Sequence, residues 1–151
     1  MIRKYFRTVL VVILIATTRL AGSPLAAEVH WYSTIEEASS EALKVNKPMH
    51  LDFWADWCAA CKVMEKDVYS DNGFADAADR FLAVRIDYDK KTAIARKYGV
   101  EALPTLVFTD SYGGELFRYR GFIDAKPLAE LMRSLPNDVS EFNKLNRILA
   151  K

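Results

Sequence analysis

The sequence predicts an α/β protein in which a mixed sheet is covered by helices on both faces. The length of 151 residues fits one domain. Apolar residues make up 51% of the chain, which is enough for a substantial core. Short apolar runs typical of strands alternate with amphipathic stretches typical of helices. Their order is βαβαβαββα plus a C-terminal tail, which favours a sheet with parallel and antiparallel neighbours.

Residues 1–27 have the pattern of a signal peptide. Basic residues up to Arg7 precede the apolar run 9–16, and small residues follow as far as Ala27. The uncharged stretch between Arg7 and Arg19 has 11 residues, whereas a membrane-spanning helix needs about 20. We therefore predict a cleaved signal peptide, with an uncleaved anchor as the alternative. Export places the protein in an oxidising compartment.

The first half of the remaining chain contains three predicted strands separated by helices. Ser33 or Thr34 caps the first helix, and the segment 46–48 ends it at a proline. A polar segment, 70–73, ends the helix after the second strand. The expected elements are a strand at 30–32, a helix ending at Val45, a strand at 49–54, a helix at 58–69, a short helix at 74–79 and a strand at 81–86.

The second half predicts a hairpin followed by two helices. Gly99 closes a helix, and the segment 111–114 has the composition of a hairpin turn. The expected elements are a helix at 92–98, strands at 105–108 and 115–120, a helix from about Asp124 to Leu135, and a short amphipathic helix with Phe142, Leu145, Ile148 and Leu149 on one face. The chain thus divides into a signal peptide at 1–27, a domain at 28–135 and a C-terminal helical extension at 136–151.

Charge and cysteine content exclude several classes of protein. Lys and Arg number 21 and Asp and Glu 20, so the basic excess expected of a protein that binds nucleic acid through phosphates is missing. The two cysteines, Cys58 and Cys61, are too few and too close to brace a fold.

Cys58 and Cys61 lie where a strand ends and a helix begins. Spacing of i and i+3 places both sulfurs on one helix face and permits a disulfide. Cys58 meets the unpaired amide groups and positive dipole end of the helix, which stabilise a thiolate. Cys61 lies one turn further along and is expected to be more buried. We therefore expect Cys58 to attack a disulfide and Cys61 to resolve the mixed disulfide.

Two other interpretations of the cysteine pair remain open. A structural zinc site requires four ligands, and His30 and His50 are not at ligand spacing. An inert structural disulfide that closes so short a loop constrains little chain entropy. No metal and no cofactor are expected.

The motif around the cysteines resembles the thioredoxin superfamily. The resemblance rests on residues 52–62, which read DFWADWCAACK, and on Leu103-Pro104-Thr105. It covers about residues 29–135 and implies a thioredoxin-like fold. Further matches at 47–48, Glu65 and 121–125 resemble the C-terminal periplasmic thioredoxin-like domain of the disulfide-interchange protein DsbD.

Two acids are candidate partners of the thiols. Alternation places Asp52 on the same strand face as His50 and Trp54, where burial favours the protonated carboxyl and allows proton exchange with Cys61. The resemblance assigns Asp52 that role and implies that Glu65, which shares a helix face with Cys61, helps to tune the thiols. The alternatives are a buried acid satisfied by hydrogen bonds and a solvated helix glutamate.

Four residues are candidates for substrate binding. The resemblance implies a cis peptide at Leu103-Pro104 that leaves the Leu103 backbone free to pair with an extended substrate. It also implies that the Gly121 backbone borders the same groove. Trp57 offers a flat apolar contact beside the nucleophile. An ordinary trans proline and a plain turn glycine are the alternatives.

The favoured function is an exported protein-disulfide reductase. No charged residue or histidine separates the cysteines, a buried acid disfavours a second negative charge at the pair, and the resemblance is to a reducing domain. Its expected partners are a disulfide-containing exported protein and a membrane-bound or soluble thiol donor, and the resemblance implies the periplasm as the compartment. The alternatives are an oxidant or isomerase of folding proteins, and a metal-delivery or assembly module docking through the helix after Pro136.

Overall fold

A five-stranded mixed sheet forms the centre of the protein, in the order β1-β3-β2-β4-β5. The computed structural model describes residues 28–149, so the predicted signal peptide lies outside the described residues. The strands are β1 (Trp31–Tyr32), β2 (Met49–Trp54), β3 (Leu82–Asp87), β4 (Thr105–Thr109) and β5 (Glu115–Arg120). The helices are α1 (Ile35–Val45), α2 (Ala59–Val63), the π-helix η1 (Met64–Val68), α3 (Asn72–Ala78), α4 (Thr92–Lys97), α5 (Ala125–Ser134) and α6 (Ser140–Leu149).

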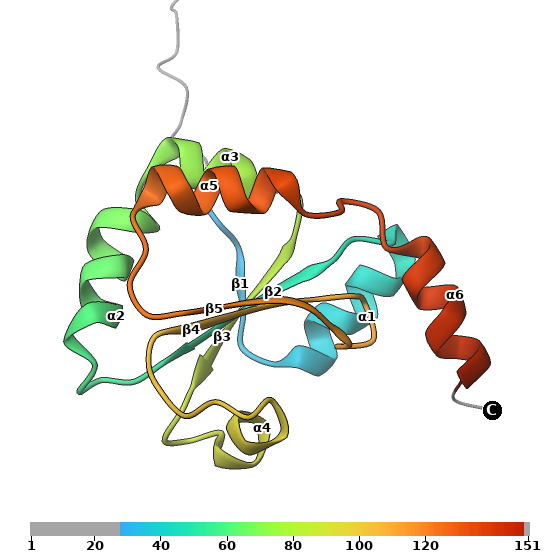
Figure 1. Ribbon diagram of the computed structural model, residues 1–151, viewed down its shortest axis with the longest axis horizontal. Helices are drawn as coiled ribbons and strands as arrows, with labels where there is room; N and C mark the ends of the chain where they lie inside the picture. The colour runs from blue at the N-terminus through green and yellow to red at the C-terminus, as the bar shows by residue number, and fades with distance from the viewer. Residues whose placement is uncertain (1–27, 150–151) are drawn as a thin grey trace, which may run out of the picture.

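The strand directions confirm the predicted mixed sheet. Strands β1 and β2 both pair with β3 in parallel, whereas β4 pairs antiparallel with β2 and β5 antiparallel with β4. Figure 1 shows the sheet between two layers of helices, with α3 and α5 on one face and α1 and α4 on the other. Strand β2 is central because its apolar residues can be covered on both sides.

Side chains that alternate along β2 belong to two different cores. Met49, Leu51 and Phe53 pack with α1 and α4 on one face of the sheet. His50, on the other face, stacks on Phe108 with the ring centroids 4.9 Å apart. The core on that face joins η1, α3 and α5 to β4. The predicted division of the strand into two faces is therefore confirmed.

His50 is fully buried, and neither ring nitrogen has a hydrogen-bond partner among the described residues. Burial lowers the pKa of this imidazole to about 3, so the ring is neutral at physiological pH. It packs as an aromatic side chain, because Phe74 and Trp31 contact it as well as Phe108. Within residues 28–149 no three His, Cys, Asp or Glu side chains gather as a metal site.

The helix predicted at 58–69 differs from the structure. The chain forms a short α-helix, α2, and then widens into the π-helix η1, in which the Tyr69 N–H donates to the Met64 carbonyl at 2.9 Å. Met64 and Val68 are buried together and Glu65 stays on the surface, an arrangement that residues four apart would also have in an α-helix. Apolar spacing in the sequence is consistent with either helix type, since π-helical turns have no distinctive composition.

The end of the chain is fastened to the domain by polar groups. The buried side chain of Asn143 in α6 accepts from the Ser111 N–H at 3.2 Å and donates to the Ser111 hydroxyl at 3.0 Å. Asn146 donates to the buried carboxylate of Asp110. The Val139 N–H donates to the Asn46 carbonyl at 2.9 Å. None of the helices among residues 28–149 is both long and apolar enough to cross a membrane.

We expect Asn143→Ala to lower the free energy of unfolding by about 1–3 kcal/mol, because it leaves the buried Ser111 N–H without its acceptor. Hydrogen exchange of the α6 amides should accelerate in the same variant. The exposed neighbour Lys144→Ala is the matched control and should change neither quantity appreciably. Equal destabilisation by the two substitutions would show that the Asn143 contacts do not hold the helix.

Candidate active site

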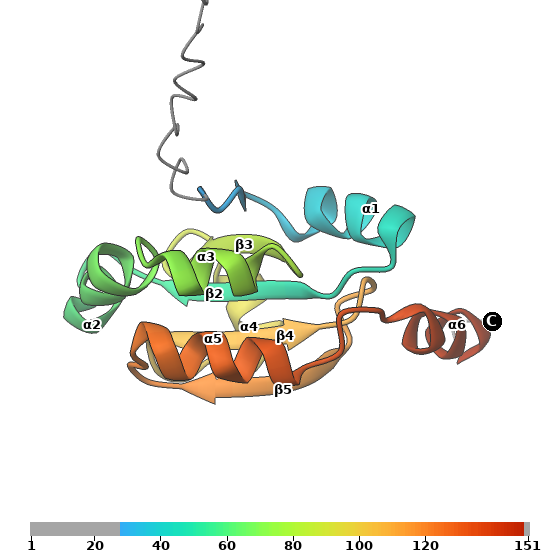
Figure 2. The same ribbon diagram turned by 90° about the horizontal axis from the view of Figure 1, so that it is seen from above.

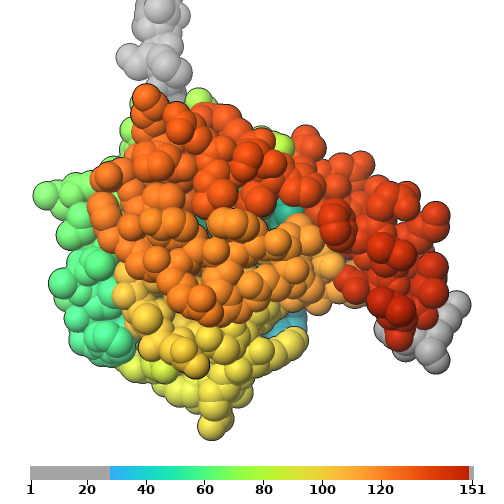
Figure 3. All heavy atoms as spheres, viewed as in Figure 1, coloured from blue at the N-terminus to red at the C-terminus, as the bar shows by residue number. Residues whose placement is uncertain are grey.

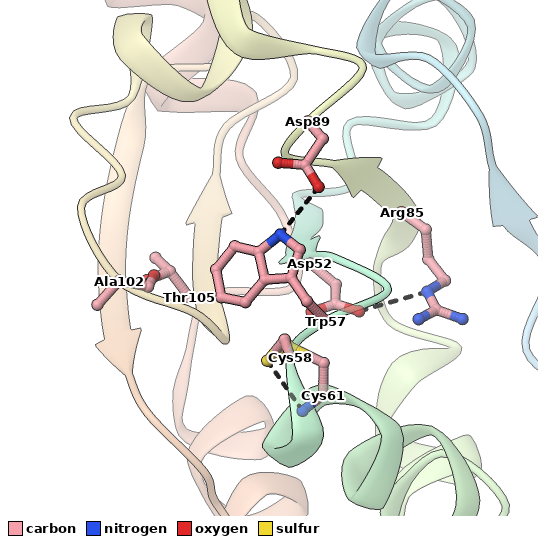
Figure 4. The surroundings of a disulfide bond; sticks show 8 residues. All are labelled: Asp52, Trp57, Cys58, Cys61, Arg85, Asp89, Ala102 and Thr105. Atoms are coloured by element: carbon pink, nitrogen blue, oxygen red, sulfur yellow. Dashed lines mark hydrogen bonds and ion pairs between the residues drawn. A yellow bond between two sulfur atoms is a disulfide. The ribbon is translucent and has the colours of Figure 1, made fainter.

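Both cysteines lie at the point where β2 leads into α2. The Cys58 N–H donates to the Ala55 carbonyl at 3.1 Å, which closes the turn after the strand. Cys58 occupies the N-cap position of α2, and its Sγ accepts a hydrogen bond from the Cys61 N–H at 3.2 Å (Figure 4). The first amide groups of a helix lack intrahelical acceptors, so they stabilise negative charge on a sulfur at this position.

Cys58 and Cys61 are joined by a disulfide, with their Cα atoms 5.3 Å apart. Cys58 is 5% exposed and Cys61 3%, so the expected difference in burial is small in this oxidised form. The two sulfurs differ instead in their neighbours. Cys58 accepts from the helix amide and adjoins Trp57, which is 66% exposed, while Cys61 lies one turn inward.

Trp57 is held over the site by a residue that the sequence analysis did not single out. Its indole N–H donates to a carboxylate oxygen of Asp89 at 2.9 Å. Asp89 follows β3, and the loop that carries it is itself tied down, because the Asp89 N–H donates to the Asp87 carboxylate at 3.1 Å. Figure 4 shows the indole plane beside the disulfide, with the nitrogen turned toward Asp89. An exposed aromatic ring with a fixed orientation can provide a preformed contact surface.

Asp52 lies in the centre of β2 and is only 2% exposed. In the view of Figure 4 its carboxylate lies between the disulfide and Arg85. Burial is the main influence on this carboxyl and raises its pKa to about 6. The Arg85 guanidinium opposes the shift, whereas the buried Tyr69 hydroxyl makes no hydrogen bond among the described residues. Asp52 can therefore exchange a proton near neutral pH.

Arg85 is a second residue that the sequence analysis missed. It is the register neighbour of Asp52 on β3, and its Nε lies 3.4 Å from an Asp52 carboxylate oxygen. Its guanidinium also stacks over the Trp54 ring, 4.6 Å from the centroid. An arginine inside an otherwise apolar strand sequence is the signal that could have drawn attention to it.

Glu65 is on the surface and reaches the site through Arg85. Its carboxylate accepts from Arg85 Nη1 at 2.9 Å, and its side chain is 55% exposed. Glu65 also contributes to the raised pKa of Asp52, since a second negative charge disfavours ionisation of the first. The structure joins Glu65 to Arg85 and Arg85 to Asp52, and the influence of Glu65 on the thiols stays a prediction.

The loop before β4 faces the disulfide. Leu103-Pro104 is a cis peptide, as the resemblance implied, and Leu103 packs against the cluster of Ala55 and the two cysteines. Thr105 closes the loop, since its hydroxyl donates to the Ala102 carbonyl at 2.7 Å. Among the described residues the Leu103 backbone makes no hydrogen bond. A backbone segment without partners beside a reactive sulfur is suited to pairing with an extended chain.

Gly121 lies next to this loop. Its N–H donates to the Pro104 carbonyl at 2.8 Å, and its φ of 95° lies in the region that favours glycine. The structure therefore brings together Trp57, Cys58, Leu103, Pro104 and Gly121 around one surface site. Asp52 lies beneath it.

Residues 35–136 match the family of thioredoxin-like domains. The chain is 35% identical over 96 residues to the thiol:disulfide interchange protein DsbD of Yersinia pestis, an alignment that covers 60% of this chain and 16% of DsbD. It is 32% identical over 103 residues to a thioredoxin of Streptomyces clavuligerus, covering 68% of this chain and 90% of that thioredoxin. The chain thus spans only a small part of the length of its DsbD relatives.

Solved structures agree with these relationships. The DsbH oxidoreductase superposes with a TM-score of 0.62 and 26% identity, covering 75% of this chain and 89% of DsbH. The C-terminal domain of Neisseria meningitidis DsbD in its reduced form gives 0.59 and 27%, covering 70% and 98% respectively. Together with the CxxC disulfide, these similarities show that the chain belongs to the thioredoxin-like family of disulfide oxidoreductases and is related to the C-terminal domain of DsbD.

Proposed function

We propose that the protein is an exported, periplasmic thiol–disulfide oxidoreductase that works as a reductase on disulfides of other exported proteins. The observation that carries the proposal is the position of Cys58, at the start of α2 beside an exposed tryptophan and an unpaired backbone segment. The relationship to the C-terminal domain of DsbD supports the direction of electron flow. The pattern of residues 1–27 supports export.

The reaction begins with the reduced pair. The Cys58 thiolate attacks one sulfur of the substrate disulfide, forms a mixed disulfide and releases the other substrate sulfur as a thiolate. Asp52 then takes the proton of the Cys61 thiol, and the Cys61 sulfur attacks Cys58. The substrate leaves as a dithiol once its two sulfurs are protonated, and the Cys58–Cys61 disulfide described above remains. Two electrons have passed to the substrate, and a thiol donor must return them.

Asp52 suits the proton transfer because its pKa of about 6 lies close to neutral pH. Arg85 keeps part of the population ionised, which the base step requires. Because burial keeps part of the Asp52 population protonated, its carboxyl does not permanently repel a thiolate that forms nearby. Trp57, Leu103 and Gly121 contact the substrate, with the Leu103 backbone adding a strand-like contact.

The proposal is tested by equilibrating the Cys58/Cys61 couple with glutathione. A reductase is expected to give a potential near that of thioredoxin, about −270 mV. Cys61→Ala should trap mixed disulfides with substrates through Cys58, and Cys58→Ala should trap none. A potential near −120 mV, typical of a strong periplasmic oxidant, would contradict the proposed direction, and trapping by Cys58→Ala would contradict the assignment of the nucleophile.

Asp52 should make stability depend on pH. Its pKa is raised from 3.8 to about 6 on folding, so the native state binds the proton more tightly than the unfolded state. The resulting stability is fully present below pH 3.8 and is lost as the pH rises through about 6. We therefore expect Asp52→Asn to be more stable than the parent oxidised protein at pH 8, by roughly 3 kcal/mol, and equally stable at the acid end.

Denaturant unfolding at a series of pH values measures this difference. Asp56→Asn removes an exposed acid four residues away and is the matched control. A difference between Asp52→Asn and the parent that stayed constant with pH would show that the carboxyl does not titrate as described.

Asp89→Ala should impair recognition of protein substrates, because it frees the Trp57 indole that Asp89 holds. The loss of one hydrogen bond should raise KM for a protein substrate about fivefold and leave kcat little changed. The rate at which a small aromatic disulfide is reduced should also change little. Trp57→Phe keeps an aromatic ring but removes the indole N–H, and it should raise KM for the protein substrate in the same way. If Asp89→Ala lowered the rate of reduction equally for protein substrates and for the small disulfide, Asp89 would act on the thiols and not on the contact between Trp57 and the substrate.

A further inference from the structure

Helix α6 is attached in the reverse of the usual way. Surface helices normally turn their apolar side to the core and their polar side to water. In α6 the side chain directed at the domain is Asn143, 2% exposed and bonded to Ser111, with Asn146 bonded to Asp110 beside it. The helix itself is therefore held by hydrogen bonds between polar groups, and the buried Val139 anchors the chain just before it.

The apolar side chains of α6 face outward. Their positions recur every three to four residues and form a stripe along the helix. The exposed fractions are 41% for Phe142, 57% for Leu145, 60% for Ile148 and 82% for Leu149. We call these four residues the α6 stripe. The polar attachment fixes the orientation of the helix, so the exposure of the stripe is built into the contact with the domain.

More exposed apolar side chains belong to the segments on which α6 is fastened. Val45 is 48% exposed and directly precedes Asn46, whose carbonyl binds the chain just before α6. Tyr112 is 44% exposed and follows Ser111 in the hairpin turn. Six of the ten large hydrophobic side chains exposed among residues 28–149 thus belong to α6 and its attachment points. A concentration of this kind marks an interaction site rather than scattered surface residues.

The shape of this end of the molecule narrows the choice of partner. Figures 1 and 2 show α6 beyond one end of the strands, apart from α3 and α5, and Figure 3 shows it as a convex lobe. A ten-residue helix is about 15 Å long. Stable protein dimers bury about 800 Å² on each partner through 20–30 residues, which is more than one stripe of four side chains provides. A flat, deformable surface can cover the apolar side of a projecting helix, whereas a second rigid copy of this chain would need a larger contact area.

The charges of α6 indicate the kind of surface. Lys144 and Arg147 are exposed; Lys144 flanks the stripe four residues before Ile148, whereas Arg147 lies on the side of Asn143. The one acid of the helix, Glu141, shares the side of Leu145 and Ile148, and its carboxylate lies 3.8 Å from the Lys144 ammonium group, so the two charges offset each other. An amphipathic helix with Phe and Leu on one side and basic residues on its polar side is the pattern of helices that lie in the interface of anionic membranes.

We propose that α6 is a peripheral membrane-binding helix whose apolar stripe enters the interface of an anionic lipid bilayer. Lys144 and Arg147 contact the lipid phosphates, and the polar attachment keeps the domain in a fixed orientation to the membrane. Because α2 and α6 lie at opposite ends of the molecule in Figures 1 and 2, the CxxC site then points away from the lipid. The site stays open to soluble substrates.

The test uses the full chain and vesicles of either phosphatidylcholine alone or phosphatidylcholine with phosphatidylglycerol. Hydrogen exchange locates the contact, and sedimentation with vesicles measures partitioning. We expect the amides of 140–149 to become protected by the anionic vesicles, and the double substitution Leu145→Asp/Ile148→Asp to weaken partitioning by at least tenfold. Lys144→Gln/Arg147→Gln should weaken it about fivefold per charge, with no such effect on phosphatidylcholine vesicles.

Phe117→Asp provides the matched control, since Phe117 is an exposed apolar residue on β5 and this variant should bind vesicles like the parent.

Three results would overturn the proposal. In the first, α6 gains no protection with anionic vesicles. In the second, the Leu145/Ile148 variant binds like the parent, so another segment is responsible. In the third, protection appears without lipid and rises with protein concentration as the mass doubles, so a second copy covers the stripe. Reduction of a soluble disulfide should be unchanged in all these variants, which separates this test from that of the proposed function.

Discussion

Asp52 lies in the central strand of the sheet, and its carboxylate is almost completely removed from water. Burial of an ionised carboxylate is strongly unfavourable unless a partner compensates it. Here the partner is Arg85 on the adjacent strand, at 3.4 Å, and it is shared with Glu65 and the Trp54 ring. Compensation is therefore incomplete, and the pKa rises to about 6 instead of falling. Incomplete pairing is what leaves this carboxyl able to change its charge during a reaction.

Arg85 connects this buried carboxyl to the surface. Its Nη1 reaches Glu65, which is largely solvated, so that contact fixes geometry more than it adds stability. The ring of Trp54 covers the guanidinium plane and limits its movement. The π-helix η1 keeps Glu65 on the surface while Met64 and Val68 remain in the core. Arg85 thus connects η1, through Glu65, with the buried carboxyl of Asp52.

Local patterns in the sequence predicted most of the fold. Helix α1 begins after Thr34, whose hydroxyl accepts from the Glu37 N–H, and β2 has the predicted bounds. These features depend on neighbouring residues, which the sequence displays directly. Asp124 precedes α5 as expected, although its side chain makes no capping hydrogen bond. The cysteines lie at the step from strand to helix that their local motif indicates, whereas the place of the proline loop beside them was implied by the resemblance alone.

The residues that sequence reasoning missed depend on register and distant contacts. Arg85 faces Asp52 because β3 pairs with β2 at one offset, and a shift of one residue would turn it to the other face. Asp89 meets Trp57 across 32 residues, and Asn143 meets Ser111 across the same interval. The apolar stripe of α6 was visible in the sequence, but its orientation was not. Periodicity shows that a helix has two faces and does not show which one meets the domain.

Strand β2 runs from the end of the molecule that carries α6 to the end that carries the CxxC disulfide. Its carboxyl end leads into the CxxC helix, and its other end follows Asn46, which binds the chain at the base of α6. Turning the α6 stripe inward would bury several apolar side chains, at about 1.5–3 kcal/mol for each one fully covered. The observed polar attachment does not gain this burial free energy. It is stable only because the buried donors and acceptors at the attachment are paired with one another. An arrangement that leaves so much favourable burial unused is intelligible if the stripe meets another apolar environment, at the end of the domain furthest from the reactive sulfurs.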